Sequence, residues 1–253
     1  MSFLKTRPLI ISLLFLGLLE LVFYYPAIMF WGSFVILVAV VAGVLVMMHG
    51  NWERGIIRRS LLPILLTVGV LSFMFFMPEP IFRQVIIVVS TLCLYFVLLN
   101  IDQFPYKSFL ITRLNFSFVS LVAAYLLYYS VSHLSVSFAM PLWTLMLVVV
   151  AVSFAVVYAV LWASGIERSK AILYTVLFGF LMSEVFLVVS FWPVDPSAKS
   201  IVLVVALYIF WGIFSHWLER ILTRRVVIEY ILVGLVLVGV VLITASWLPP
   251  FLI

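Results

Sequence analysis

The chain has 253 residues, of which 67% are hydrophobic and 9% are charged, and its mean hydropathy is +1.38. Soluble domains carry roughly a quarter charged residues, so this composition excludes a water-soluble fold. The formal net charge of +5 is interpreted as a consequence of membrane topology and not as an affinity for nucleic acid. The one cysteine, Cys93, lies inside an apolar run and has neither a disulfide partner nor metal-ligand spacing. We expect no metal and no cofactor.

Nine apolar runs, separated by short polar gaps, cover the chain from end to end. Each approaches the roughly 20 residues needed to cross a hydrocarbon core about 30 Å thick. Valine and isoleucine are frequent, but the lengths of the runs and the lack of alternation favour helices over strands. The sequence therefore predicts an all-α, polytopic transmembrane helix bundle that forms a single domain over residues 1–253. The predicted helices span residues 8–25, 27–48, 61–77, 84–100, 114–132, 140–162, 171–191, 200–217 and 229–247.

The first run follows Lys5 and Arg7, and in that respect it resembles a secretory signal peptide. No small-x-small cleavage site follows it, so we expect a helix that is retained in the protein. Pro26 leaves almost no loop before the second run, so a tight turn joins the two helices.

Basic residues fall almost entirely in every second gap between the runs. Arg83 and Lys199 lie in the other gaps. The residues on the side of the N-terminus are Lys5, Arg7, Arg54, Arg58, Arg59, Lys107, Arg113, Arg168, Lys170, Arg220, Arg224 and Arg225. By the positive-inside rule, this asymmetry predicts a cytoplasmic N-terminus and an external C-terminus. It also supports the count of nine, because splitting or merging one run would put basic clusters on both sides.

Glu184 lies inside the seventh run, about 5 Å to the outer side of its middle at 1.5 Å per residue. A carboxylate at that depth costs on the order of 3 kcal/mol unless it is paired, protonated or hydrated. One interpretation makes Glu184 a proton-exchanging acid or a contact for a cation or substrate. The other makes it a protonated acid that fixes helix packing through a hydrogen bond to a neighbouring serine or tyrosine.

Glu20 lies in the first run at nearly the same depth, also toward the outside. If the first and seventh helices touch, Glu20 and Glu184 can face a common cavity and share a proton. Glu20 is also close enough to the end of its helix to reach the surface. Both acids are therefore candidate proton-exchanging residues, and Glu184 is the deeper of the two.

Arg83 and His133 are the candidate residues of the outer gaps. Arg83 is either a counter-ion to an intramembrane acid or the surface partner of Glu79 at positions i and i+4. His133 begins a polar gap over residues 133–139, where we expect a solvated residue of an outer vestibule. No second His or Cys lies near it in the sequence, which argues against a metal site.

Arg220, Arg224 and Arg225 form a basic cluster between the eighth and ninth runs. Such clusters attract anionic lipid headgroups at around 1 kcal/mol for each residue, and they also set topology, which is sufficient reason for their presence. Arg225 and Glu229 are four residues apart and would pair if one helix includes both.

Small residues recur every four positions on several runs, a pattern typical of close helix contact. Examples are Ala39 and Gly43 on the second run, and Ala151, Ala155, Ala159 and Ala163 on the sixth. The contact is with another helix of this chain, another membrane protein or a second copy.

A set of residues in the C-terminal half is typical of a known group of sequences: Glu184, Trp192-Pro193, Tyr208, Arg224-Arg225, Glu229-Tyr230 and Trp247. In these residues the chain resembles an uncharacterised bacterial family of polytopic membrane proteins. The resemblance implies a multi-pass protein of the bacterial cytoplasmic membrane, and it implies no assigned activity.

The chain contains no phosphate-binding Gly-rich loop with lysine, no His-Glu-x-x-His and no Gly-x-Ser-x-Gly. The sequence therefore favours a non-enzymatic protein, either transporter-like or a subunit of a membrane complex. The alternative is an intramembrane enzyme acting on a lipid or isoprenoid, with Glu184 and Glu20 as acid and base. The expected partners are the bilayer, anionic headgroups on its cytoplasmic side, and a membrane protein or a second copy, but no nucleic acid.

Overall fold

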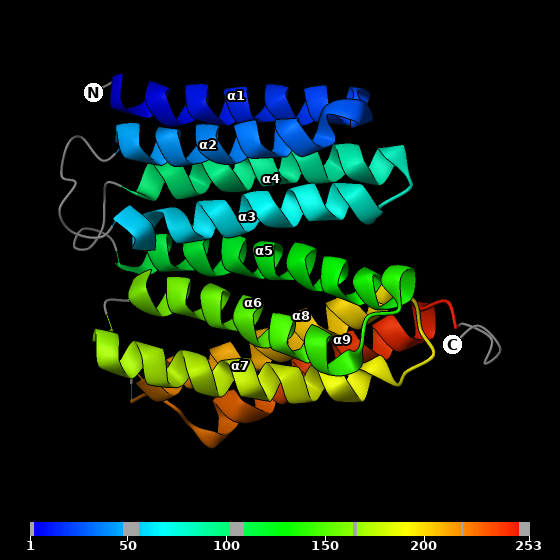
Figure 1. The fold of residues 1–253 in the computed structure, drawn as a ribbon. Coiled ribbons are helices and arrows are strands. Elements are labelled where there is room, and N and C mark those ends of the chain that lie inside the picture. The colour runs from blue at the N-terminus through cyan, green and yellow to red at the C-terminus, as the bar shows by residue number, and fades with distance from the viewer. Residues whose placement is uncertain (1–2, 48–55, 102–108, 164–165, 219, 248–253) are drawn as a thin grey trace. The chain divides into compact units, whose positions relative to one another are not determined.

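The computed structural model describes residues 3–47, 56–101, 109–163, 166–218 and 220–247. Its described residues are helical apart from connecting loops and an isolated antiparallel bridge between Val194 and Trp247. Figure 1 colours the helices by their order in the chain, from blue α1 to red α9. They are α1 (Phe3–Tyr24), the 3₁₀ helix η1 (Pro26–Ile28), α2 (Met29–Met47), α3 (Ile56–Phe76), α4 (Pro80–Ile101), α5 (Phe109–Phe138), α6 (Leu142–Ala163), α7 (Arg168–Ser190), α8 (Pro196–Leu218) and α9 (Arg224–Thr244).

Each of the nine α-helices in the described ranges contains a span of 18 to 24 residues that is apolar enough to cross a membrane. At 1.5 Å per residue, such spans match a bilayer core of roughly 30 Å. Helices also satisfy the backbone hydrogen bonds that hydrocarbon leaves without water partners. For the described residues, the prediction of an all-α fold with nine membrane-length helices is confirmed.

The helix ends differ from the predicted boundaries in a systematic way. Four helices, α1, α3, α5 and α9, each begin five residues before their predicted starts at residues 8, 61, 114 and 229. The predicted starts follow the apolar runs, whereas basic residues just outside a run are good helix formers and extend the helix to the membrane surface. For these four helices, hydropathy therefore locates the span but places the start of the helix too late.

The largest single difference concerns α5, which continues to Phe138 instead of ending at residue 132. Most of the predicted polar gap is therefore helical, and His133 lies on a helix and not in a solvated loop. The helix ends where Ala139 adopts a left-handed φ of 47°. Pro141 follows two residues later, and a proline disfavours helical backbone in the residue before it.

The chain forms two compact units, which are described separately. Unit 1 comprises Met1–Leu127 and Phe154–Thr175, and unit 2 comprises Tyr128–Ser153 and Val176–Ile253. The division passes through α5, α6 and α7. The single domain expected from the sequence stays a prediction.

In unit 1 the first four helices pack side by side, with α1 and α3 each contacting both α2 and α4 (Figure 1). Two glycines of α2 allow the close approach of α1. A Cβ added at Gly43 would lie 2.7 Å from Ile11 Cγ2, and one added at Gly32 would lie 2.5 Å from Val22 Cγ2. The helix contact that the spacing predicts at Gly43 is therefore made within the chain.

In unit 2, α9 packs on α8 through two reciprocal glycine contacts. The ring of Tyr230 on α9 covers Gly212 of α8, where an added Cβ would lie 2.1 Å from Tyr230 Cε1. In the other direction, Ile209 of α8 covers Gly234, the buried residue of α9. The remainder of α9 is largely exposed, as a helix at the lipid boundary would be.

Candidate functional site

Glu184 lies on an exposed face of α7, within a row of outward-pointing side chains. This row, the α7 stripe, consists of Leu177, Phe180, Glu184 and Val188 on α7 and of Phe191, the residue directly after the helix. Successive members are three, four, four and three residues apart, a spacing that keeps them on one side of a helix. The four apolar members are each more than half exposed. The stripe is therefore an apolar surface interrupted by one carboxyl group.

Among the described residues, Glu184 has no hydrogen-bonding or ion-pairing partner. The hydroxyl of its neighbour Ser183 donates instead to the carbonyl of Phe180, at 2.8 Å. Glu184 lies six residues before the end of α7 at Ser190, which is about 9 Å along the helix axis. The structure thus presents a carboxyl group well inside a membrane-length helix, on the outside of unit 2, without compensation from the described part of the chain.

Glu20 is held differently, by a partner inside unit 1. Gln84 Nε2 donates a hydrogen bond of 3.0 Å to Glu20 Oε2 and so joins α4 to α1. Both side chains are half-buried. Glu20 lies four residues before the end of α1, and Gln84 lies four residues after the start of α4, so the bond forms near matching helix ends. A carboxyl group that is hydrogen-bonded in this way costs less to place in the membrane than a bare one.

Arg83 fixes the connection that brings Gln84 to Glu20. Its Nε donates to the carbonyl oxygen of Met77, the residue after α3. Its backbone N–H donates to the carbonyl of Glu79 at 3.3 Å. Carbonyls at a helix end lack intrahelical donors, and a guanidinium group satisfies them well. The contacts of Arg83 are thus with backbone, and its role as a counter-ion stays a prediction.

Polar side chains from distant segments meet around Asp195 in unit 2. Asp195 Oδ2 accepts a hydrogen bond from Ala198 N, at 3.1 Å, in the first turn of α8. Asp195 Oδ1 accepts from the hydroxyl of Ser246, at 3.3 Å, just after α9. The carboxylate also acts electrostatically on His133 of α5 and Lys199 of α8. We call Asp195, His133, Lys199 and Ser246 the Asp195 cluster.

The remaining contacts of the Asp195 cluster also stabilise helix ends. The ammonium of Lys199 donates to the carbonyl of Ser190 at 3.1 Å, the favourable position for a cation at the C-terminus of α7. The ring of His133, which is half-buried, lies 4.3 Å from that of Tyr129 between centroids. The hydrogen bonds of Asp195 and Lys199 therefore join the end of α7, the start of α8 and the segment after α9 within unit 2, which accounts for these residues structurally.

The proximity of the residues of the Asp195 cluster was not predicted from the sequence. The sequence places His133 in one outer gap and Asp195 with Lys199 in another, because residues more than sixty positions apart share no local pattern. One local signal was available. Asp195 followed by Pro196 is a typical helix start, with aspartate as the N-cap and proline at the first helical position.

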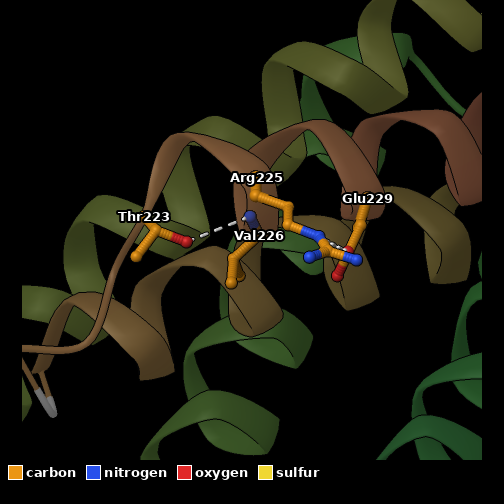
Figure 2. Close-up of polar contacts among 4 residues, drawn as sticks. All are labelled: Thr223, Arg225, Val226 and Glu229. Carbon is orange, nitrogen blue, oxygen red and sulfur yellow. Dashed lines mark hydrogen bonds and ion pairs between the residues drawn. The ribbon is translucent and has the colours of Figure 1, made fainter.

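The turn between α8 and α9 carries the basic cluster, whose three arginines are exposed: Arg220, Arg224 and Arg225. Arg225 Nε pairs with Glu229 Oε1 at 3.0 Å (Figure 2). This is the contact that their spacing predicts, and it forms because α9 includes both residues. Thr223 is the N-cap of α9, and its hydroxyl accepts a hydrogen bond from Val226 N at 3.4 Å (Figure 2). An exposed arginine cluster at a membrane-length helix end can attract anionic headgroups.

Other ionisable groups of the described residues give no further site. Lys170 pairs with Glu167 at 3.2 Å, and the hydrogen bond from its ammonium lowers the pKa of the exposed Glu167 carboxyl. Cys93 is buried. Within the described ranges, no three His, Cys, Asp or Glu side chains lie close enough together to hold a metal ion.

Comparison with known sequences places the chain in a family. Residues 6–244 match the family described as "Protein of unknown function (DUF5656)", so the chain belongs to that family. The match extends well beyond the C-terminal stretch in which the sequence resembles an uncharacterised family. No curated protein and no solved structure matches the chain.

Proposed function

We propose that the chain is a non-enzymatic, multi-pass subunit of a membrane complex, and that another membrane protein contacts its α7 stripe. The observation that carries this proposal is the exposed Glu184, which has no partner among the described residues and is flanked by apolar side chains. An uncompensated carboxylate in hydrocarbon costs on the order of 3 kcal/mol. A neighbouring protein that offers a hydrogen-bond donor or a cation removes that cost, so the exposed acid favours association.

An intramembrane enzyme would need its acid and base to converge on an enclosed substrate site. Glu184 lies on an exposed helix face, and the carboxyl of Glu20 is engaged by Gln84. These positions give no support to the alternative in which the two acids act on a lipid or isoprenoid. A transporter would turn such a group inward, toward a passage. Of the two non-enzymatic interpretations, the exposed acid therefore favours the complex subunit.

The proposal includes the topology that the charge distribution predicts, with a cytoplasmic N-terminus and an external C-terminus. It also includes the location that the family resemblance implies, the bacterial cytoplasmic membrane. The basic cluster at the start of α9 then faces the anionic headgroups of the inner leaflet. Reporter domains fused to the C-terminus test this part of the proposal. Activity of an external reporter is expected, and activity of a cytoplasmic reporter at that end would contradict it.

Photo-cross-linking in native membranes tests the proposed contact. A photoreactive phenylalanine analogue replaces Val188 on the α7 stripe or, as the matched control, Leu235 on α9, which is also apolar and exposed. We expect a discrete adduct with another membrane protein from position 188 and none from position 235. Adding Glu184→Gln should reduce that adduct roughly tenfold, since a polar contact between membrane helices contributes about 1–2 kcal/mol. The same adducts from both positions, or an adduct that is insensitive to Glu184→Gln, would contradict the proposal.

A further inference from the structure

The α7 stripe has a chemistry that restricts which partner fits it. Glu184 stands alone at its centre, with Phe180 four residues before it and Val188 four residues after it, both more than half exposed. We infer that the partner is a transmembrane helix of a different protein that places a lysine or arginine side chain against Glu184. This inference rests on the proposed function and specifies the partner for the same surface.

Depth is the first reason for a cation. Glu184 lies about 9 Å inside the end of α7, and a glutamate side chain is too short to bring its carboxylate to the headgroups from there. Lipid tails offer no donor, so the group needs one from protein. Once Phe180 and Val188 are covered, water is excluded and the effective dielectric falls, which strengthens the attraction between opposite charges. A buried cation left without Glu184 would be costly in turn, so the pairing is specific.

The shape of the stripe is the second reason. Its spacing of three, four, four and three residues follows one helix face along the outer part of α7. That pattern gives a straight seam against which one partner helix can pack at a small crossing angle. Apolar members on both sides of Glu184 then contact the partner helix and position its basic residue at the depth of the carboxylate.

A second copy of this chain fits the stripe poorly. Two copies in one membrane share a topology, so a two-fold axis normal to the bilayer brings equal depths together. Glu184 of one copy would then meet Glu184 of the other, and every other member of the stripe is apolar. Neither copy supplies a cation, and two adjacent carboxylates repel each other. Charge complementarity therefore favours a different protein.

The inference is tested with a synthetic partner. The purified full-length chain, carrying a donor dye, is reconstituted in vesicles with an acceptor-labelled poly-leucine transmembrane helix that has one lysine at the depth of Glu184. The control helix has leucine at that position. We expect energy transfer to report binding of the lysine helix roughly tenfold tighter than that of the leucine helix. Glu184→Gln should abolish the difference.

Two further variants separate charge pairing from a general effect on folding. Glu20→Gln removes the second candidate acid, which already accepts a hydrogen bond from Gln84. This variant should still bind the lysine helix more tightly than the leucine helix. The Glu184→Lys variant should no longer bind the lysine helix preferentially. It should instead bind most tightly a helix that has glutamate at the same depth. Equal binding of the lysine and leucine helices by the wild-type chain would overturn the inference. Self-association of the chain that depends on Glu184 would also overturn it, in favour of a second copy.

The two proposals fail in different ways. If position 188 cross-links to a membrane protein in a Glu184-dependent manner but the lysine helix shows no preference, the complex stands and the cationic partner is wrong. If neither result is obtained, both proposals fall.

Discussion

Glu20 in unit 1 and Glu184 in unit 2 are both acids within membrane-length helices, yet their surroundings differ. Glu20 is half-buried and accepts a hydrogen bond from Gln84 on a neighbouring helix. Glu184 is exposed on the α7 stripe and has no partner among the described residues. The first arrangement stabilises helix packing inside one chain. The second leaves a carboxyl group without a hydrogen-bond donor or a cation, which another molecule can supply.

This difference shows that the presence of an intramembrane acid does not define its role. The cost of placing a carboxyl group in hydrocarbon is similar for both residues at equal depth. What differs is the source of the compensating donor. Where the donor belongs to the same chain, the acid is part of the fold. Where no donor of the chain is present, we propose that the acid belongs to a contact surface.

The largest expected effect concerns membrane insertion. Glu184→Leu should lower the apparent free energy of inserting α7 by about 3 kcal/mol, because it removes a charged group from the hydrocarbon. Glu20→Leu in α1 should have a smaller effect, because Glu20 is four residues from the end of its helix and can reach the surface. A glycosylation-based insertion assay on each segment gives both values. A larger change in insertion free energy for Glu20→Leu than for Glu184→Leu would contradict the interpretation that Glu184 lies deeper in the membrane than Glu20.

The next effect concerns the hydrogen bond in unit 1. Gln84→Leu should lower the free energy of unfolding of the full chain by about 2 kcal/mol, because the half-buried carboxyl of Glu20 loses its donor. Replacing Glu20 and Gln84 together with leucine should recover most of that loss. In the same unfolding assay in lipid bicelles, Glu184→Leu should change stability by less than about 0.5 kcal/mol. A loss at position 184 as large as that at position 84 would show that Glu184 has a partner inside the chain.

A third acid, Asp195 at the start of α8, extends the comparison to a helix end of unit 2. Asp195→Ala removes the cap of α8 and the contact with Ser246, so it should lower stability by about 1 kcal/mol. Asp195→Asn, which retains an oxygen acceptor for Ala198 N, should lower it less. Thermal unfolding of the purified variants measures the difference. Equal losses for the two variants would assign the effect to charge and not to helix capping.

The smallest effect is expected for an acid that already forms an ion pair on an exposed helix face. Glu229 pairs with Arg225 on the exposed start of α9, and i,i+4 ion pairs at such positions contribute about 0.3–0.5 kcal/mol. Glu229→Gln should therefore change the free energy of unfolding by no more than that amount, and added salt should reduce the difference further. A loss above about 1 kcal/mol would imply that the pair is shielded from solvent.

Much of the fold could be predicted from the sequence, because hydropathy and charge are strong signals in a membrane chain. The nine membrane-length spans of the described ranges follow from apolar runs of the right length. The full extent of α5 could not be predicted from hydropathy. Serine and histidine lower the hydropathy of residues 133–138 without preventing a helix, which ends only near Ala139 and Pro141.

The environment of the candidate residues was much harder to predict. In a soluble helix the polar face reveals which side is exposed, but a membrane helix is apolar on all sides. The outward position of Glu184 therefore has no local signature, although its depth does. The pairing of Glu20 with Gln84 and the gathering of His133 and Lys199 around Asp195 depend on tertiary packing. Among the ionisable side chains, the spacing of Arg225 and Glu229 predicted a contact directly, since both lie on one helix.

Reaction with dicyclohexylcarbodiimide tests the central claim most directly. This reagent partitions into lipid and modifies carboxyl groups that are accessible from it, and mass spectrometry of the digested chain locates the products. In the purified chain, Glu184 should react roughly tenfold faster than Glu20, because a hydrogen bond such as that from Gln84 to Glu20 contributes up to about 1.5 kcal/mol. Equal or faster modification of Glu20, or protection of Glu184 in the isolated chain, would contradict an unpartnered acid on the α7 stripe.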